Sequence, residues 1–165
     1  MTNLRYHVEE LKALSDTDFI TITALIDSLH EKCKVSVGKD RLKKIISEAN
    51  KHVFVIKARS DENQNERIVA MVLFSFNKTI CLNKVSLTEL VVLPKYRQQG
   101  LARVLFKYCI DQCIAYEADI VELVVHRDNS EAIALYKTFG VDYSNYDYMR
   151  LILRPWMQDE TINID

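Results

Sequence analysis

Apolar residues recur along this chain with two different periods, one typical of strands and one typical of helices. From Leu101 to Cys109 they follow the i, i+3, i+4, i+7, i+8 spacing of a helix that packs one face on a sheet. From Leu90 to Leu93 they are aliphatic or β-branched, which is typical of a strand covered on both faces. The wholly polar segment 60–66 lies between two apolar runs and predicts the loop of a hairpin.

The same pattern predicts the order of elements along the chain. Strands are expected over residues 4–8, 53–58, 68–76, 85–93, 120–125 and 148–153, and helices over about 16–34, from about 39 onward, from 101 onward and over about 130–139. Asp16 or Asp18 can cap the first of these helices. No internal repeat or linker interrupts the order, so we expect a mixed α/β sheet in one domain over residues 1–165, with a tail of about 155–165 that could be flexible.

The step from the strand 85–93 to the helix that starts at 101 carries the most informative chemistry. Pro94 cannot continue the strand, and Gly100 stands in the tight turn just before the helix. The first backbone N–H groups of a helix have no partners inside the helix, and the helix dipole adds partial positive charge there. Such a turn can hold a phosphate without any lysine side chain, which indicates a phosphorylated cofactor.

Two short motifs support this interpretation. The spacing Arg97-x-x-Gly100-x-Ala102 resembles the phosphate-binding signature of the GNAT superfamily of N-acetyltransferases. The block NSEAIALYKTFGV at residues 129–141 resembles the other hallmark of that family, an Asn, then Ala, then Leu-Tyr, then Gly followed by an apolar residue. The chain has only three glycines, and Gly100 and Gly140 occupy the two motif positions, so we expect the backbone to need glycine at both.

The resemblance implies a fold and a cofactor. The fold is a mixed, mostly antiparallel sheet flanked by about four helices, in which the parallel strands 85–93 and 120–125 splay apart and acetyl-CoA enters the cleft. The pantetheine arm would run beside the first of these strands, and the pyrophosphate would bind the turn. The cofactor-binding residues implied in this way are Leu90, Val91, Val92, Arg97, Gln98, Gln99, Gly100, Leu101, Ala102, Arg103 and Asn129. Asn129 can equally be the N-cap of the next helix.

The resemblance also implies catalytic roles. An alkylamine is almost wholly protonated at neutral pH and must lose a proton before it attacks a thioester. Tyr136 matches the tyrosine to which the family assigns protonation of the leaving CoA sulfur. Glu89, the acidic residue of the strand before the turn, is the candidate base, although simple alternation leaves open which face of the sheet it occupies. Some protein-acetylating relatives carry a glutamate where this chain has Val124, so the alternatives to Glu89 are an ordered water and His126.

Composition narrows the class of protein. The chain has 165 residues, of which 48% are hydrophobic, and this length and composition favour one globular domain. Its formal net charge of −1 argues against nucleic acid as a partner. The longest apolar stretch, 68–76, is far below the ~20 residues of a membrane-spanning helix, and the N-terminal residues lack the apolar segment of a secretory signal. Four cysteines without C-x-x-C spacing favour a reducing, cytoplasmic setting. Cys109 and Cys113 have no histidine close in sequence, which favours buried thiols over a metal site for this pair.

The sequence therefore predicts a GNAT-type N-acetyltransferase, monomeric or homodimeric, that moves acetyl from acetyl-CoA to a primary amine by direct attack, without a metal or a covalent enzyme intermediate. The amine can belong to a small molecule or to a protein or peptide. The alternative is a non-catalytic CoA-binding or regulatory module that kept the cleft and lost a usable base. A nucleotide-binding domain is disfavoured, because the turn lacks the glycine, lysine and Ser/Thr pattern that holds a triphosphate.

Overall fold

The computed structural model describes residues 4–29, 37–60 and 66–143 of the chain. The chain divides into two compact units, Met1–His126 and Arg127–Asp165. The predicted strand 148–153, the tail 155–165 and the predicted end of the first helix near Lys34 lie outside the described residues.

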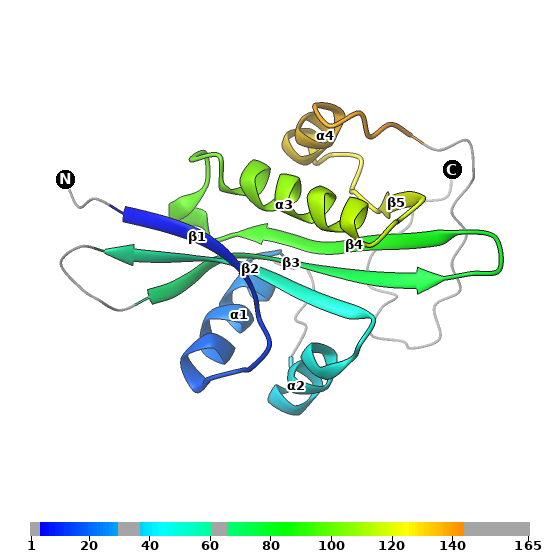
Figure 1. Cartoon of the computed structure of the whole chain (residues 1–165). Helices are drawn as coiled ribbons and strands as arrows, with labels where there is room; N and C mark the ends of the chain where they lie inside the picture. Colours follow the sequence, from blue (N-terminus) through cyan, green and yellow to red (C-terminus); the bar gives the residue numbers. More distant parts are fainter. Residues whose placement is uncertain (1–3, 30–36, 61–65, 144–165) are drawn as a thin grey trace, which may run out of the picture. The chain divides into compact units, whose positions relative to one another are not determined.

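A five-stranded sheet forms the centre of the first unit (Figure 1). Its strands lie side by side in chain order: β1 (Leu4–Glu10), β2 (Lys51–Ser60), β3 (Glu66–Lys78), β4 (Asn83–Val92) and β5 (Ile120–Leu123). The strands β1 to β4 pair antiparallel, and β4 pairs parallel with β5. The helices of this unit are α1 (Asp16–Leu29), α2 (Lys39–Ser47) and α3 (Leu101–Ala115), and a 3₁₀ turn covers Pro94–Tyr96. The second unit contains α4 (Ser130–Lys137).

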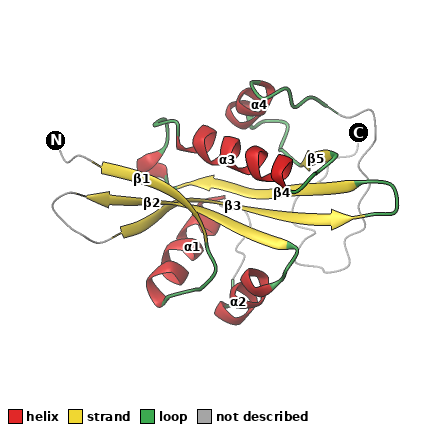
Figure 2. Ribbon diagram, viewed as in Figure 1, coloured by secondary structure: helices red, strands yellow, loops and turns green. Residues whose placement is uncertain are grey.

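The predicted fold class is confirmed: the described residues form a mostly antiparallel sheet with one parallel pair and four helices. The hairpin strands β2 and β3 extend beyond the predicted apolar runs 53–58 and 68–76, because polar residues such as Lys51 and Lys78 still pair through their backbones. In contrast, β5 ends at Leu123, two residues before its predicted end. Figure 2 shows how short β5 is beside β4.

The sheet separates two apolar cores, because successive residues of a strand face opposite sides. One core lies under α1 and α2, and its buried residues come from these helices, the segment after β1 and the strands β2 to β4: Leu11, Ile22, Leu25, Ile26, Leu42, Val53, Val55, Ile68, Met71, Leu73 and Val91. The other core lies under α3, whose buried residues are Leu101, Leu105, Phe106, Cys109 and Cys113. Figure 1 shows α3 on one face of the sheet and α1 with α2 on the other.

The start of α1 differs in detail from the prediction. Ser15, rather than Asp16 or Asp18, caps the helix, because its hydroxyl oxygen accepts the backbone N–H of Asp18 at 3.1 Å. The Asp18 carboxylate in turn accepts the backbone N–H of Ser15 at 3.4 Å, which completes a capping box, and it also accepts the Ser15 hydroxyl at 2.6 Å. Asp16 instead forms an ion pair with Lys39 at the start of α2.

Candidate functional site

Strand β4 contains one more residue than its neighbour β3 near Glu89. Thr88 pairs with Leu73 and Val91 pairs with Met71, so three steps along β4 correspond to two steps along β3. Glu89 has a φ of 54°, in the left-handed region that residues other than glycine rarely adopt. These two observations define a β-bulge at Glu89.

The bulge changes which side chains of β4 share a face of the sheet. Simple alternation would place Glu89 with Val91 and Leu93, but the extra residue interrupts the alternation at Glu89. Val91 belongs to the core under α1 and α2, whereas the adjacent Val92, which pairs with Ala70, is buried on the opposite face. The strand is therefore covered on both faces, as its apolar residues predicted, and the candidate base lies at the break in the pattern.

Strands β4 and β5 separate at nearly the same level. Their parallel pairing runs from Lys84 with Ile120 to Leu87 with Leu123 and ends there. Because β4 continues to Val92, its β5-side edge beyond Leu87 has no neighbour among the strands that the structure describes. This is the splayed pair that the resemblance implied. An extended chain can add to such an edge as a further strand and satisfy its backbone groups.

The segment 97–100, which we call the α3 turn, leads from β4 to the start of α3. Within it, Gln98 and Gly100 have φ angles of 59° and 80°, so both lie in the left-handed region. The first hydrogen bond of α3 runs from the N–H of Val104 to the carbonyl of Gly100 at 3.1 Å. The N–H groups of the first turn therefore point outward at the helix N-terminus, and Gly100 has no side chain with which to cap them.

The space around Gly100 is open. A Cβ atom built on Gly100 would meet no heavy atom within 4 Å, and the residue is exposed. Close approach to the backbone, several N–H donors and the positive end of a helix dipole are what a diphosphate requires. The backbone from Gln98 to Arg103 therefore has the features that bind a diphosphate, and the edge of β4 has those that accept an added extended chain.

Two side chains of the α3 turn are held by other parts of the first unit. The Arg97 Nε donates to the Val92 carbonyl at 3.1 Å and so ties the turn to the end of β4. Gln99 accepts a hydrogen bond from the Tyr6 hydroxyl at 2.8 Å. Sequence reasoning missed Tyr6, because 93 positions separate it from Gln99 and no motif connects the two.

The second motif lies in the second unit, where Asn129 and Tyr136 belong to α4. Asn129 is the N-cap of this helix, since its Oδ1 accepts the N–H of Ala132 at 3.1 Å. Tyr136 lies near the end of the helix and is half-buried, and this burial raises the pKa of its hydroxyl above 10.0. A hydroxyl that stays protonated at neutral pH is suited to donate a proton.

Gly140 ends α4. Its φ is 80°, its N–H donates to the Lys137 carbonyl at 3.1 Å, and the N–H of Val141 donates to the Tyr136 carbonyl at 3.2 Å. These are the two hydrogen bonds of a Schellman motif, in which glycine is favoured because the residue must be left-handed. Gly140 therefore has a clear role in helix termination, whereas Gly100 stands at a helix start.

The sequence model of the Acetyltransferase (GNAT) family matches residues 21–141, a span that includes the bulge, the α3 turn and α4. The chain belongs to this family. As a GNAT enzyme it is an acetyl-CoA-dependent N-acetyltransferase. No curated protein sequence matches the chain significantly.

Solved structures share the fold at low sequence identity. A tetramutant of the BH1408 protein from Bacillus halodurans has a TM-score of 0.72 and 20% identity, over 89% of this chain and 99% of that one. An aminoglycoside acetyltransferase from an uncultured soil metagenomic sample has a TM-score of 0.72 and 16% identity, over 89% and 96% of the two chains. Glucosamine-6-phosphate N-acetyltransferase from Arabidopsis thaliana has a TM-score of 0.68 and 16% identity, over 89% and 98%.

Other residues considered from the sequence are placed as follows. His126 and Val124 are both exposed after β5. Cys109 and Cys113 are buried in α3, and burial raises the pKa of both thiols, that of Cys113 to about 11. Within the described residues, no group of three or more His, Cys, Asp or Glu side chains could hold a metal ion. No helix in the described part of the chain is long and apolar enough to cross a membrane.

Proposed function

We propose that this GNAT enzyme transfers acetyl from acetyl-CoA to a primary amine by direct attack, as a single domain over residues 1–165 and in a reducing, cytoplasmic setting. The observation that carries the proposal is the short path from the splayed edge of β4 to the exposed N-terminus of α3. When bound, acetyl-CoA supplies the acetyl group as a thioester. The protein has to hold this molecule, admit the amine and move two protons.

The proposed cofactor site follows this path. The backbone of Leu90, Val91 and Val92 takes the pantetheine arm as an added strand. The N–H groups from Gln98 to Arg103 hold the diphosphate, and the exposed Arg103 side chain adds positive charge beside it. Asn129 contributes its side-chain nitrogen, because its oxygen is engaged in capping α4.

The amine is proposed to approach the bulge from the side of α1 and α2. On the α3 side, β4 presents Val85 and Leu87, which are buried. On the opposite side it presents Ser86, which is half-buried, and Thr88, which is exposed. Polar and accessible positions beside Glu89 favour this side for a hydrophilic acceptor, whether a small molecule or a protein or peptide amine.

The two proton transfers are assigned to Glu89 and Tyr136. Glu89 removes a proton from the ammonium group, directly or through an ordered water, and His126 is the alternative base. The Tyr136 hydroxyl donates its proton to the sulfur of the leaving thiolate, and its raised pKa keeps that proton available at neutral pH. A backbone N–H of Val91 or Val92 stabilises negative charge on the acetyl oxygen, a contribution of about 3 kcal/mol for one well-placed donor.

Steady-state kinetics with a panel of amines tests this function. The panel contains simple alkylamines, polyamines, aminoglycosides and peptides, and the readouts are CoA release and the mass of the acetylated product. With an active amine, Tyr136→Phe keeps the ring but removes the donated proton. We expect it to lower kcat by roughly 10²-fold or more and to leave the KM for acetyl-CoA almost unchanged.

Tyr143→Phe is the matched control in the same unit. Tyr143 is exposed, and its ring, which lies under the Lys137 ammonium, is retained in the variant. We expect wild-type turnover in this control, and wild-type turnover in Tyr136→Phe would contradict the acid role. If wild type binds acetyl-CoA yet acetylates no amine in the panel, the non-catalytic module becomes the better interpretation. If it binds no acetyl-CoA, the proposed cofactor site is wrong.

A further inference from the structure

We propose that Tyr6 is a positioning residue for the α3 turn, and that it sets the affinity for the diphosphate of acetyl-CoA without taking part in the chemistry. Tyr6 lies in β1, at one edge of the sheet and outside both sequence motifs. The proposal rests on the cofactor site described under the proposed function and adds a residue to it.

One hydrogen bond connects β1 with the α3 turn, and a second connects the turn with the 3₁₀ segment before it. The Tyr6 hydroxyl donates to Gln99 Oε1 at 2.8 Å, and Gln99 Nε2 donates to the Lys95 carbonyl at 3.4 Å. Tyr6 itself is fixed by the ladder between β1 and β2, where it pairs with Ala58. The side chain of Gln99 is thus held at both of its polar atoms, one of them by a rigid strand.

The α3 turn needs such a restraint. Gln99 lies between Gln98 and Gly100, and both of these residues are left-handed. A non-glycine residue in that region is strained by roughly 1–2 kcal/mol and keeps its conformation only where surrounding contacts hold it. Upstream, the turn is anchored by the buried Tyr96 and by the Arg97 contact with Val92. Tyr6 supplies the restraint at the half of the turn that faces the helix N-terminus.

The surroundings of Tyr6 keep its hydroxyl a donor. Burial, and then the nearby Tyr96 hydroxyl, raise the pKa of Tyr6 above 10.0, so the proton persists through neutral and mildly alkaline pH. If the hydroxyl is lost, the α3 turn samples further conformations, and only a fraction of the molecules present the N–H groups in the binding geometry. The apparent affinity for a diphosphate then falls by that fraction, while the reacting groups are unchanged.

The test compares two acetyl donors. In Tyr6→Phe we expect the Kd and KM for acetyl-CoA to rise about 3- to 10-fold, the range that one hydrogen bond supports, with kcat unchanged. Acetyl-pantetheine carries the same thioester but has no diphosphate, so its kcat/KM should be the same in Tyr6→Phe and wild type. Gln99→Leu should match Tyr6→Phe for acetyl-CoA, and the double variant should lose no more than either single variant.

Tyr116→Phe is the matched control, since Tyr116 is 43% exposed where Tyr6 is 36% exposed, and it follows the other end of α3. It should leave both donors unaffected. Unchanged acetyl-CoA affinity in Tyr6→Phe overturns the inference, as do equal losses for the two donors or additive losses in the double variant. These results leave the proposed function intact, because wild type still binds and acetylates. A wild type that binds no acetyl-CoA overturns the cofactor site and this inference with it.

Discussion

The two ends of α3 differ in whether other groups of the protein pair with their free backbone N–H and C=O groups. At the N-terminal end, the first-turn N–H groups point outward, the preceding glycine is exposed, and two residues of the turn are left-handed. At the C-terminal end, the N–H of Tyr116 donates to the Gln112 carbonyl at 2.9 Å and the N–H of Ala118 to the Cys113 carbonyl at 3.0 Å. The last turn is thereby closed by its own chain.

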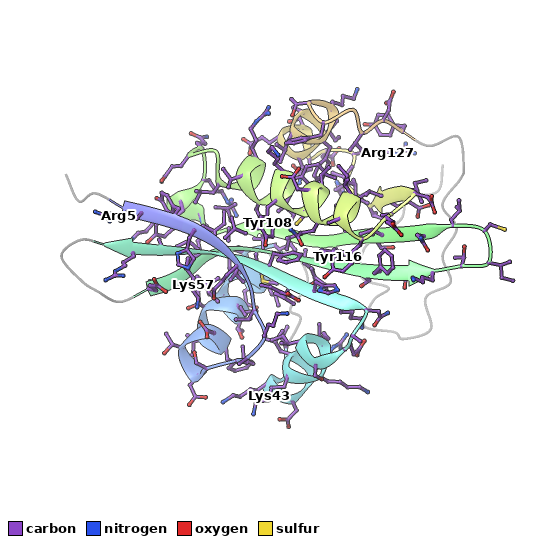
Figure 3. All side chains as sticks on the ribbon, in the orientation of Figure 1. Arg5, Lys43, Lys57, Tyr108, Tyr116 and Arg127 are labelled. Atoms are coloured by element: carbon purple, nitrogen blue, oxygen red, sulfur yellow. The ribbon has the colours of Figure 1, made fainter. Side chains whose placement is uncertain are left out.

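Side chains complete the C-terminal end further (Figure 3). The His52 ring stacks on Phe74 with centroids 4.9 Å apart and lies 5.3 Å from the Tyr116 ring. His52 Nδ1 is 2.7 Å from Glu10 Oε1, and the other oxygen of Glu10 is 2.9 Å from Lys12 Nζ. This set of aromatic and paired polar groups, which we call the His52 cluster, fills one end of the helix–sheet interface.

Residues of strand β1 make contacts at both ends of α3. Tyr6 and Glu10 share a face of β1, because they are four residues apart in a regular strand. Tyr6 contacts Gln99 of the α3 turn, and Glu10 contacts His52 at the other end. We propose that the closed end contributes stability and that a ligand completes the open end. Substitutions at the two ends should therefore separate stability from cofactor affinity.

The largest expected effect is at the closed end, in Phe74→Ala. Phe74 is fully buried in the His52 cluster, and truncation of such a ring typically costs about 3–5 kcal/mol of unfolding free energy. Urea denaturation measures this loss. Phe76→Ala is the control, since Phe76 is only half-buried at the margin of the same cluster and should lose less. The molecules that remain folded should bind acetyl-CoA as wild type does, and a raised Kd in that folded fraction would break the comparison.

The next effect is at the open end, in Gly100→Ala. We expect a roughly 10- to 100-fold weaker affinity for acetyl-CoA by calorimetry, because a methyl group occupies the space of the diphosphate and hydrogen bonds to a charged group are lost. Gly140→Ala is a close match: Gly140 also has a φ of 80° and no heavy atom within 4 Å of a built Cβ. Both variants should lose about 1–2 kcal/mol of stability from left-handed strain. Equal acetyl-CoA affinities in the two variants would rule out a special role for Gly100.

The smallest effect concerns the pH dependence of the stability that Glu10 contributes. Burial alone would raise its pKa, but hydrogen bonds from Lys12 and His52 lower the pKa below 4.5. Because the folded-state pKa is the lower one, the stabilisation is present above the unfolded-state pKa and is lost as the pH falls through the folded-state pKa. In urea denaturation, Glu10→Gln should be less stable than wild type by about 1 kcal/mol at pH 7, and the difference should vanish toward pH 3. A difference that persists at pH 3 would assign the effect to packing.

Local sequence was sufficient to predict most of the helices and strands and the α3 turn. Pro94 and Gly100 impose a strand end and a left-handed helix start by their own backbone preferences, and the spacing after Leu101 fixes the buried face of α3. The bulge could not be predicted in this way, because glutamate has no preference for a φ of 54° and the conformation at Glu89 depends on how β4 pairs with β3.

Two further features depend on partners that are distant in the sequence. Val124 and Val125 continue the apolar pattern of β5, yet pairing with β4 stops at Leu123, a limit that only the position of the partner strand reveals. The contact between Tyr6 and Gln99 joins an edge strand to a turn far along the chain, and no local pattern marks either residue. The sequence therefore did not predict the local shape of β4 and of its edge, whereas it did predict that Gly100 stands just before the start of α3.

Strand β4 carries one residue that its core contacts do not need. On either side of the bulge, Thr88 and Val91 pair with Leu73 and Met71, and an unbulged strand one residue shorter would keep the same side chains on the same faces. A deletion of a single codon between positions 88 and 91 would thus leave both apolar cores filled while removing the bend that the bulge imposes. The number of residues in this strand thus sets the backbone shape at Glu89, and a shortened gene would encode much the same core without that bend.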